Sequence, residues 1–217
     1  AQMGRGKTER NTTFAMATIA GTLAKMAFDA CLFNSQNFAF VKLPKECTTG
    51  SSIMPHKKNP DVFELIRAKS NKLQALPAQI TLVMNNLPSG YFRDLQIIKE
   101  EFLPAFGELK DCLRMAAYIV NKMEVNEHIL DDPRYDLMFS VEEVNRLAAD
   151  GMPFRDAYKK VGLDIEAGRF VPDKNIHHTH EGSIGNLCND RIRGLMDGIM
   201  SGFTFEKMEQ AEKNLLK

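Results

Sequence analysis

Three long segments in the first part of the chain carry apolar side chains at the three- and four-residue spacing of an amphipathic helix. The first covers residues 11–36, with apolar positions at Phe14, Met16, Ile19, Leu23, Met26, Ala27, Ala30 and Cys31. The second runs from Asn59 to Met84. The third covers residues 95–122, with apolar positions at Ile98, Phe102, Leu103, Phe106, Leu109, Leu113, Ala116 and Ile119. Three helices of this length predict a helical bundle.

Prolines and polar residues mark where these helices begin or bend. Asn59 is a suitable N-cap, Pro60 suits the first helical position, and Asp61 places an acid in the first turn, so the second helix is predicted to start there. Pro77 and Pro104 lie inside helical patterns and each removes a backbone donor. We expect a kink at each of these two prolines.

The segment between the first two helices has no periodic pattern. Residues 37–59 contain Pro44, Gly50, Pro55 and a cluster of threonines and serines, which predicts an extended loop. A long irregular loop in a compact protein is usually functional or disordered.

The second part of the chain carries shorter helical patterns. They cover residues 126–129, 136–150, 153–161 and 182–200. No segment alternates convincingly with a period of two, so no strand is predicted. The expected fold is therefore all-α, with residues 1–123 in a long-helix bundle and residues 124–217 in a small helical C-terminal domain.

Composition narrows the classes of function. The 217 residues include 28 Lys and Arg against 28 Asp and Glu, so the balanced charge argues against nucleic acid as a partner. Apolar stretches such as residues 12–24 are shorter than the roughly 20 residues that span a bilayer, so no membrane partner is expected. The four cysteines are widely spaced without a CxxC pair, which favours reduced thiols in a cytoplasmic protein.

The densest polar cluster lies directly before the second helix, at residues 48–60. It combines hydroxyl groups, Lys57, Lys58 and backbone amides at a helix N-terminus, an arrangement that favours a small carboxylate or phosphate. The simpler alternative is that Asn59 only caps the helix, the lysines are solvated and the serines belong to turns.

A second polar cluster contains His177, His178 and His180. Histidines close together suggest a metal site, but acidic and cysteine partners at ligand spacing are missing from the sequence around them. We therefore expect no metal and no other cofactor.

The cluster before the second helix resembles a known motif. The twelve residues GSSIMPHKKNPD, positions 50–61, resemble the signature loop of the fumarase/aspartase superfamily, and we refer to residues 47–60 as the signature loop. The segments FELIRAKSNK, YFRDLQIIK and YDLMFSVEEVNRLAADGMPFRDAY resemble the branch of that superfamily that cleaves argininosuccinate into arginine and fumarate. The resemblance covers residues 11 to about 160 and stops at a segment, 162–185, that matches no motif of the family.

The resemblance implies a β-elimination and assigns roles to eight residues. Ser51 would be the catalytic base, and Glu64 would pair with a catalytic histidine of another subunit. The matching substrate-binding positions are Ser52, Lys57, Asn59, Tyr91, Gln96 and Lys99. A serine is a weak base, so Ser51 needs nearby amides and Lys57 to stabilise its alkoxide.

The resemblance also implies an assembly. Members of the superfamily are homotetramers that build each active site from three subunits around a central helical bundle. The motifs that carry the catalytic histidine lie upstream of the part represented here, so we expect this chain to be a C-terminal half that is inactive on its own. Two alternatives remain open: another lyase of the superfamily, such as one that cleaves adenylosuccinate, and a non-catalytic relative like the lens crystallins.

Overall fold

The computed structural model describes residues 4–215 and divides the chain into two compact units, Ala1–Ile129 and Leu130–Lys217. The first unit is built almost entirely from long helices, as the sequence predicts. Its elements are α1 (Lys7–Phe33), β1 (Val41–Lys42), the 3-10 turn η2 (Lys45–Cys47), α2 (Asp61–Gln74), α3 (Leu76–Met84), the 3-10 turn η3 (Arg93–Gln96), α4 (Ile98–Val120) and β2 (Glu124–Val125).

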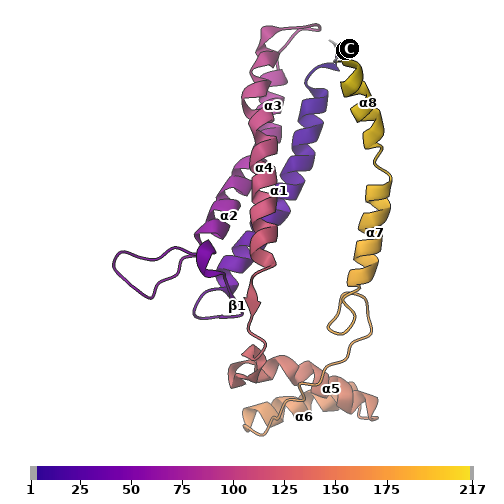
Figure 1. Cartoon of the computed structure of the whole chain (residues 1–217). Coiled ribbons are helices and arrows are strands. Elements are labelled where there is room, and N and C mark those ends of the chain that lie inside the picture. The colour runs from indigo at the N-terminus through magenta and orange to yellow at the C-terminus, as the bar shows by residue number, and fades with distance from the viewer. Residues whose placement is uncertain (1–3, 216–217) are drawn as a thin grey trace. The chain divides into compact units, whose positions relative to one another are not determined.

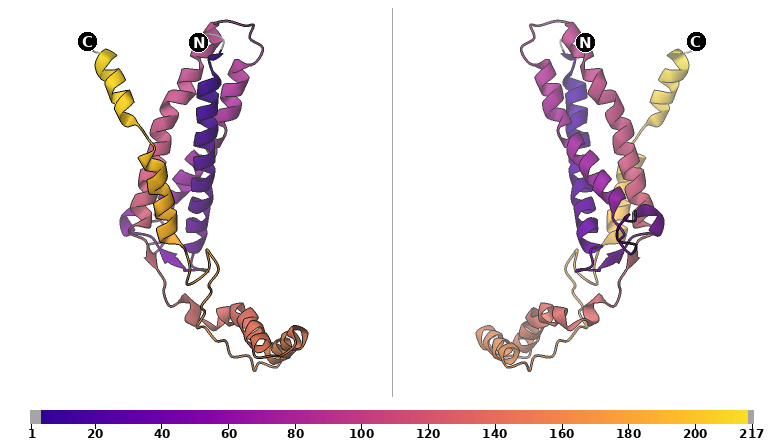
Figure 2. Two further views of the ribbon diagram at one scale, coloured as in Figure 1. Left: turned by 90° about the vertical axis from the view of Figure 1, so that its right-hand side faces the viewer. Right: turned by 90° about the vertical axis from the view of Figure 1, so that its left-hand side faces the viewer.

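The long helices of the first unit lie lengthwise beside one another. The chain runs along α1, returns along the consecutive pair α2 and α3, and runs back along α4 (Figures 1 and 2). The signature loop therefore lies at one end of the bundle, and the connection between α3 and α4 lies at the other end (Figure 1). This confirms the predicted helical bundle.

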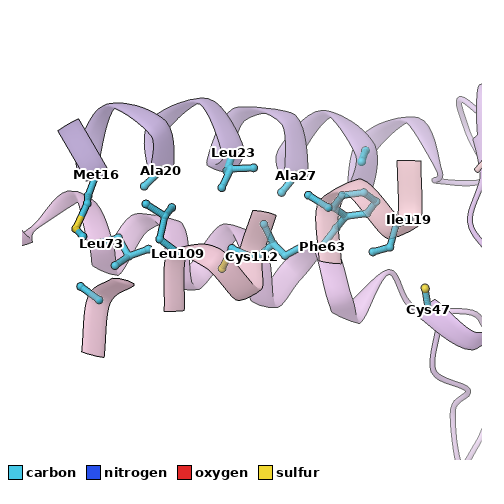
Figure 3. Close-up of a cluster of buried hydrophobic side chains, with 14 of the residues drawn as sticks. Met16, Ala20, Leu23, Ala27, Cys47, Phe63, Leu73, Leu109, Cys112 and Ile119 are labelled. Carbon is cyan, nitrogen blue, oxygen red and sulfur yellow. The ribbon is translucent and has the colours of Figure 1, made fainter. Parts of the chain in front are cut away.

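Small residues on α1 let it pack closely against α2. Ala20 and Ala27 are fully buried and face a layer of larger side chains (Figure 3). The layer comes from α2 and α4 and includes Phe63, Leu73, Leu109, Cys112 and Ile119. Alanine brings a helix backbone close to its neighbour without creating a cavity, so these alanines help to fix the spacing of the bundle.

Not every apolar residue of the helical patterns lies in this core. Phe14 and Ile19 of α1 are exposed, as are Leu103 and Phe106 of α4. Both helices carry apolar residues around much of their circumference, so spacing alone does not select the buried face. The first unit consequently presents large apolar side chains on its outer surface.

The start of α1 depends on a glycine. α1 begins at Lys7 rather than at residue 11, and Gly6, its N-cap residue, has a left-handed conformation with φ of 88°. A Cβ atom on Gly6 would lie only 2.7 Å from Sδ of Met84 at the end of α3. Gly6 thus permits a close contact between α1 and α3 that another residue would disturb.

The two prolines that were expected to kink helices occupy different positions in their helices. Pro77 does not kink a continuous helix: the helix ends at Gln74, and α3 begins at Leu76 with Pro77 in its first turn. At that position a missing N–H removes no helical hydrogen bond. Pro104 lies inside α4, which continues through it as one element.

A short β-ladder was not predicted. β1 pairs with β2 in antiparallel register, with Val41 opposite Val125, and the side chains of Lys42 and Glu124 form an ion pair of 2.7 Å. Two residues per strand are too few to produce a detectable alternation. The ladder joins the chain after α1 to the chain after α4, and the all-α class still holds.

The second unit contains shorter elements. They are the 3-10 turns η4 (Ile129–Asp131, which begins at the last residue of the first unit) and η5 (Pro133–Phe139), followed by α5 (Ser140–Ala149), α6 (Phe154–Glu166), α7 (Asn189–Ser201) and α8 (Phe205–Leu215). α5 and α6 pack through Val144, Ala157 and Val161. The predicted helix at 126–129 is wrong, the patterns at 136–150 and 182–200 begin too early, and α8 was missed.

α1 has the length and hydropathy of a membrane-spanning helix. A single helix of this kind is weak evidence for a membrane, because core helices of bundles meet the same criteria. Here one face of α1 packs against α2 and α4 in the core of the first unit.

The core assignment predicts a large effect of truncating Phe63. This α2 side chain is 0% exposed, whereas Leu65 on the same helix is 59% exposed. Phe63→Ala should lower the free energy of unfolding by about 3–5 kcal/mol through lost burial and a cavity. Denaturant unfolding of the chain measures this effect, and Leu65→Ala is the control. Equal losses in both variants would contradict the assignment.

Candidate functional site

The signature loop is closed at its base by contacts between its two ends. The N–H of Thr49 donates to the carbonyl of Asn59 over 3.2 Å, and the N–H of Asn59 donates to the carbonyl of Thr49 over 2.8 Å. The hydroxyl of Thr49 also donates to the carboxylate of Asp61 in the first turn of α2. We call these three contacts the neck of the loop.

Ser51 lies just beyond the neck, and its oxygen receives two backbone hydrogen bonds. The N–H groups of Ile53 and Met54 each donate to Oγ of Ser51 over 3.2 Å. Two such donors favour negative charge on the oxygen that they contact. The oxygen of Ser51 is thus already held by two backbone amides.

Of the remaining predicted residues of the loop, Ser52 and Lys57 lie beyond the neck, whereas Asn59 belongs to it. Ser52 and Lys57 are exposed, and the N–H of Lys57 donates to the carbonyl of Met54 over 3.1 Å. The prediction that the Asn59 side chain caps α2 is wrong: Pro60 occupies the N-cap position, and no side-chain cap bond is formed. The backbone N–H and carbonyl of Asn59 instead form the neck bonds with Thr49, and Asn59 lies one residue before the N-cap residue of α2.

Glu64 is placed in the first turn of α2 with an exposed side chain. Burial raises the pKa of the Cys31 thiol of α1, nearby Arg67 opposes this rise, and Glu64 adds to it by a smaller amount. Glu64 thus shares the loop end of the bundle with Ser51.

The structure brings Tyr91, Gln96 and Lys99 together in a chain of hydrogen bonds. The Gln96 amide donates to the hydroxyl oxygen of Tyr91, and Nζ of Lys99 donates to Oε1 of Gln96 over 2.7 Å. The guanidinium of Arg5 lies 5.2 Å from the centre of the Tyr91 ring. Gln96 ends the 3-10 turn η3, and α4 begins at Ile98 rather than at residue 95, where the third helix was predicted to start.

These two groups of residues lie at opposite ends of the bundle within one chain. The signature loop precedes α2, whereas Tyr91 follows α3. Figure 1 shows the start of α2 and the end of α3 at opposite ends of the bundle. The intervening helices contain 14 and 9 residues, so at 1.5 Å per residue roughly 35 Å of helix separates the groups. One small substrate cannot contact both groups of the same chain.

The entrance to the loop is anchored to the end of α4. Nζ of Lys122 lies 2.8 Å from Oε1 of Glu46, and the hydroxyl of Tyr118 donates to the same oxygen over 3.2 Å. The bond from Lys122, with smaller help from the hydroxyl of Tyr118, lowers the pKa of Glu46 to about 2, and the pKa of Lys122 is raised in turn. Next to this contact, the side chain of Cys47 is buried in the bundle core.

An apolar cleft of about 330 Å³ also opens in the first unit. Its lining includes Met26, Phe33, Val41, Phe63 and Val120. Thr22, Lys25 and Asp29 also line the cleft, but most of its surface is apolar, so a dicarboxylate placed there would lose most of its hydration for few hydrogen bonds. The cleft therefore does not compete with the signature loop as an anion site.

The histidines of the second unit lie near acidic side chains. Nε2 of His178 is 3.3 Å from Oε1 of Glu142, and the rings of His178 and His180 are 5.4 Å apart. His177 lines a neighbouring polar cavity of about 380 Å³. Within residues 4–215, no group of three or more metal-ligating side chains is close enough to hold an ion.

The sequence analysis did not identify the residues that fix the position of the signature loop without belonging to the predicted substrate-binding set. Thr49 and Asp61 close the neck, and Glu46 with Lys122 anchors the loop entrance. Asp61 was recognised only as an acid of the first helical turn. The contact between Glu46 and Lys122 joins residues 76 positions apart, so no local pattern indicates it.

Known proteins resemble this chain over its whole length. A family model described as Lyase matches residues 10–75. The chain is 77% identical over 216 residues to the argininosuccinate lyase of Phocaeicola vulgatus, a match that covers 100% of this chain and 48% of that relative. The argininosuccinate lyase of Parabacteroides distasonis is 70% identical with the same coverage. The chain thus spans about half the length of the curated relatives that it matches.

Solved structures resemble the fold. Class II fumarase from Schistosoma mansoni superposes with a TM-score of 0.64 at 18% identity, covering 75% of this chain and 34% of the fumarase. The resemblance seen in the motifs up to about residue 160 is confirmed, and it extends through the segment 162–185 that the motifs left unassigned.

The contact between Glu46 and Lys122 makes a prediction about pH. A depressed pKa means that the contact stabilises the fold above the ordinary glutamate pKa of 4.5 and that this contribution is lost as the pH falls toward 2. A carboxyl ¹³C NMR titration should therefore give Glu46 a midpoint near 2, and Lys122→Met should return it toward 4.5. A wild-type midpoint at the ordinary value would contradict the contact.

Proposed function

We propose that this chain, which belongs to the argininosuccinate lyase family, supplies the anion-binding signature loop of an enzyme that splits argininosuccinate into arginine and fumarate. The observation that carries the proposal is the loop itself, where a closed neck presents Ser51 with two amide donors on its oxygen. The high identity to argininosuccinate lyases over the whole chain supports the choice of substrate.

The succinyl part of the substrate carries two carboxylates and needs positive groups. In this proposal Lys57 contributes a full charge, while Ser52 and Asn59 contribute hydrogen-bond donors. The N-terminus of α2 directly follows these residues, and its dipole favours an anion at the same place. The exposed position of Lys57 and Ser52 leaves their side chains available to a ligand.

Ser51 then removes the proton from the carbon next to a substrate carboxylate. The C–H proton passes to the Ser51 alkoxide, the electron pair of that bond forms the new double bond, and the C–N bond breaks with its electrons on the guanidino nitrogen. That nitrogen would take a proton from an acid of the completed site or from water, and arginine leaves. A serine can act as the base only when its alkoxide is stabilised. The N–H groups of Ile53 and Met54 and the ammonium of Lys57 would provide this stabilisation.

Glu64 acts indirectly in this scheme. Its family position pairs with a histidine of another subunit, and its exposed side chain at the loop end of the bundle leaves it available for such a partner. The carboxylate would orient the histidine and favour its charged form.

The separation of the two residue groups supports an assembly with shared sites. Because Tyr91, Gln96 and Lys99 lie at the far end of the bundle from Ser51, they would bind the substrate held by the signature loop of another copy. The exposed apolar side chains of α1 and α4 provide a surface for packing the copies into a homotetramer. The reaction needs no metal or organic cofactor.

A cytoplasmic location completes the proposal. The four cysteines are free thiols, two of them buried in the bundle core. Burial raises the pKa of Cys47 and Cys112 and keeps both protonated. Unpaired thiols are typical of reducing compartments.

The first prediction concerns substrate and base. The full-length protein, extended to the length of its relatives, should release fumarate from argininosuccinate and not from adenylosuccinate. Ser51→Ala should lower kcat by a factor of roughly 100 or more, because it removes the group that takes the proton. The absorbance of fumarate measures both effects, and Ser35→Ala, at a half-buried serine outside the loop, is the control.

Three outcomes separate the alternatives. Turnover of adenylosuccinate instead would assign the protein to another lyase of the superfamily. A folded oligomer that is silent with both substrates would favour a non-catalytic relative. An S51A variant with wild-type turnover would remove Ser51 from the mechanism.

A second prediction concerns the 217-residue chain alone. It should show no turnover, since the proposal takes the catalytic histidine from outside this chain. The fumarate assay tests this prediction with a sample of the 217-residue chain whose helical fold has been verified by circular dichroism. Fumarate release by the isolated chain would contradict the shared site.

A further inference from the structure

We propose that Thr49 and Asp61 act as a clasp that positions Ser51 for proton abstraction. This inference rests on the function proposed above and assigns to that reaction two residues beyond the eight implied by the resemblance. The clasp is the hydrogen bond from the Thr49 hydroxyl to the Asp61 carboxylate at the neck of the signature loop.

The clasp joins the loop to a rigid element. Asp61 is the first residue of α2, and Phe63, two residues later, is fully buried in the bundle core. The Asp61 carboxylate is a charged acceptor, which forms a stronger hydrogen bond than a neutral one. Thr49, only two residues before Ser51, is thereby tied to the bundle.

The chain on the entry side of the loop is fixed as well. The side chain of Cys47 is 3% exposed. The carboxylate of Glu46 accepts hydrogen bonds from Tyr118, in α4, and from Lys122, just after the end of α4. Beyond the neck the loop is open to solvent, with Ile53 87% exposed. Thr49 is therefore the last residue before Ser51 whose side chain is bonded to the bundle.

The backbone bonds of the neck are a single isolated bridge, not part of a sheet. An isolated pair of strand-like bonds is weak in water without neighbouring strands or an apolar face. The hydroxyl-to-carboxylate bond adds a third contact at the same place. Without it, the mobile span would extend backwards from Gly50 toward Cys47, and Ser51 would sample positions from which it cannot reach the substrate.

Hydrogen exchange of the 217-residue chain tests the clasp without any substrate. In Thr49→Val, the amides of residue 49 and Asn59 should exchange roughly three- to tenfold faster than in the wild type, the equivalent of one lost hydrogen bond. Thr49→Ser should restore slow exchange, and Asp61→Asn, which keeps an oxygen acceptor, should fall between them.

Thr48→Val is the matched control. The hydroxyl of Thr48 donates to the carbonyl of Lys45 within its own turn and does not cross the neck. Its removal should leave the exchange of the neck amides unchanged. Equal exchange of these amides in T49V and T48V would overturn the clasp.

Turnover of the full-length protein tests the positioning role. T49V should lower kcat roughly three- to tenfold with a smaller change in KM, because misplacement of the base weakens the transition state more than substrate binding. Thr49→Ser should recover most of the rate. A T49V variant with faster neck exchange but unchanged kcat would show that the clasp is structural only and would overturn the proposal.

The two readouts keep this inference separate from the proposed function. If the full-length wild type does not cleave argininosuccinate, the proposed function fails, and with it the positioning role. The exchange comparison still decides whether the clasp exists. If the wild type is active, the comparison of T49V with T48V and T49S decides the inference alone.

Discussion

The fixed length of the α2 and α3 pair is the constraint on which the functional account depends. Packed helices do not shorten, so the signature loop at the start of α2 and the group of Tyr91, Gln96 and Lys99 after α3 stay at opposite ends of the bundle. Both groups match substrate-binding positions of one family. The simplest arrangement that lets both contact one substrate is a site formed between copies of the chain, and the apolar outer surface of the bundle is available for that contact.

The bundle also determines how the loop can work. Small residues of α1 bring it close to α2, and Phe63 holds the start of α2 in the core. The loop leaves this support at Cys47 and returns to it at Asp61. Its base is therefore fixed, while Ser51 and Lys57 lie on a part that faces solvent. Such a division suits a loop that must hold a base near a substrate and still admit that substrate.

Most of the helices could be predicted from the sequence, and each element or contact that was missed has a physical reason. Helical spacing predicted α1, α4 and the α2–α3 segment, but it could not identify the buried face of α1, which is apolar on several sides. The strands β1 and β2 were missed because two residues carry no alternation. α7 was predicted with too early a start and α8 was missed, and the described side chains of both helices are exposed. The loop residues were identified through a motif. Their neck and the contact between Glu46 and Lys122 are tertiary and had no local signal. The roles of the eight site residues and the domain boundary after residue 123 stay predictions.

The central claim is that this chain contributes the signature loop to a site completed by another subunit. The most direct measurement is fumarate release from argininosuccinate by mixed oligomers, obtained by refolding the 217-residue chain together with full-length Ser51→Ala subunits. The account predicts turnover by the mixture and none by either component alone, because the chain supplies Ser51 and the variant supplies the remainder of the site. Mixed oligomers that form but release no fumarate would contradict it.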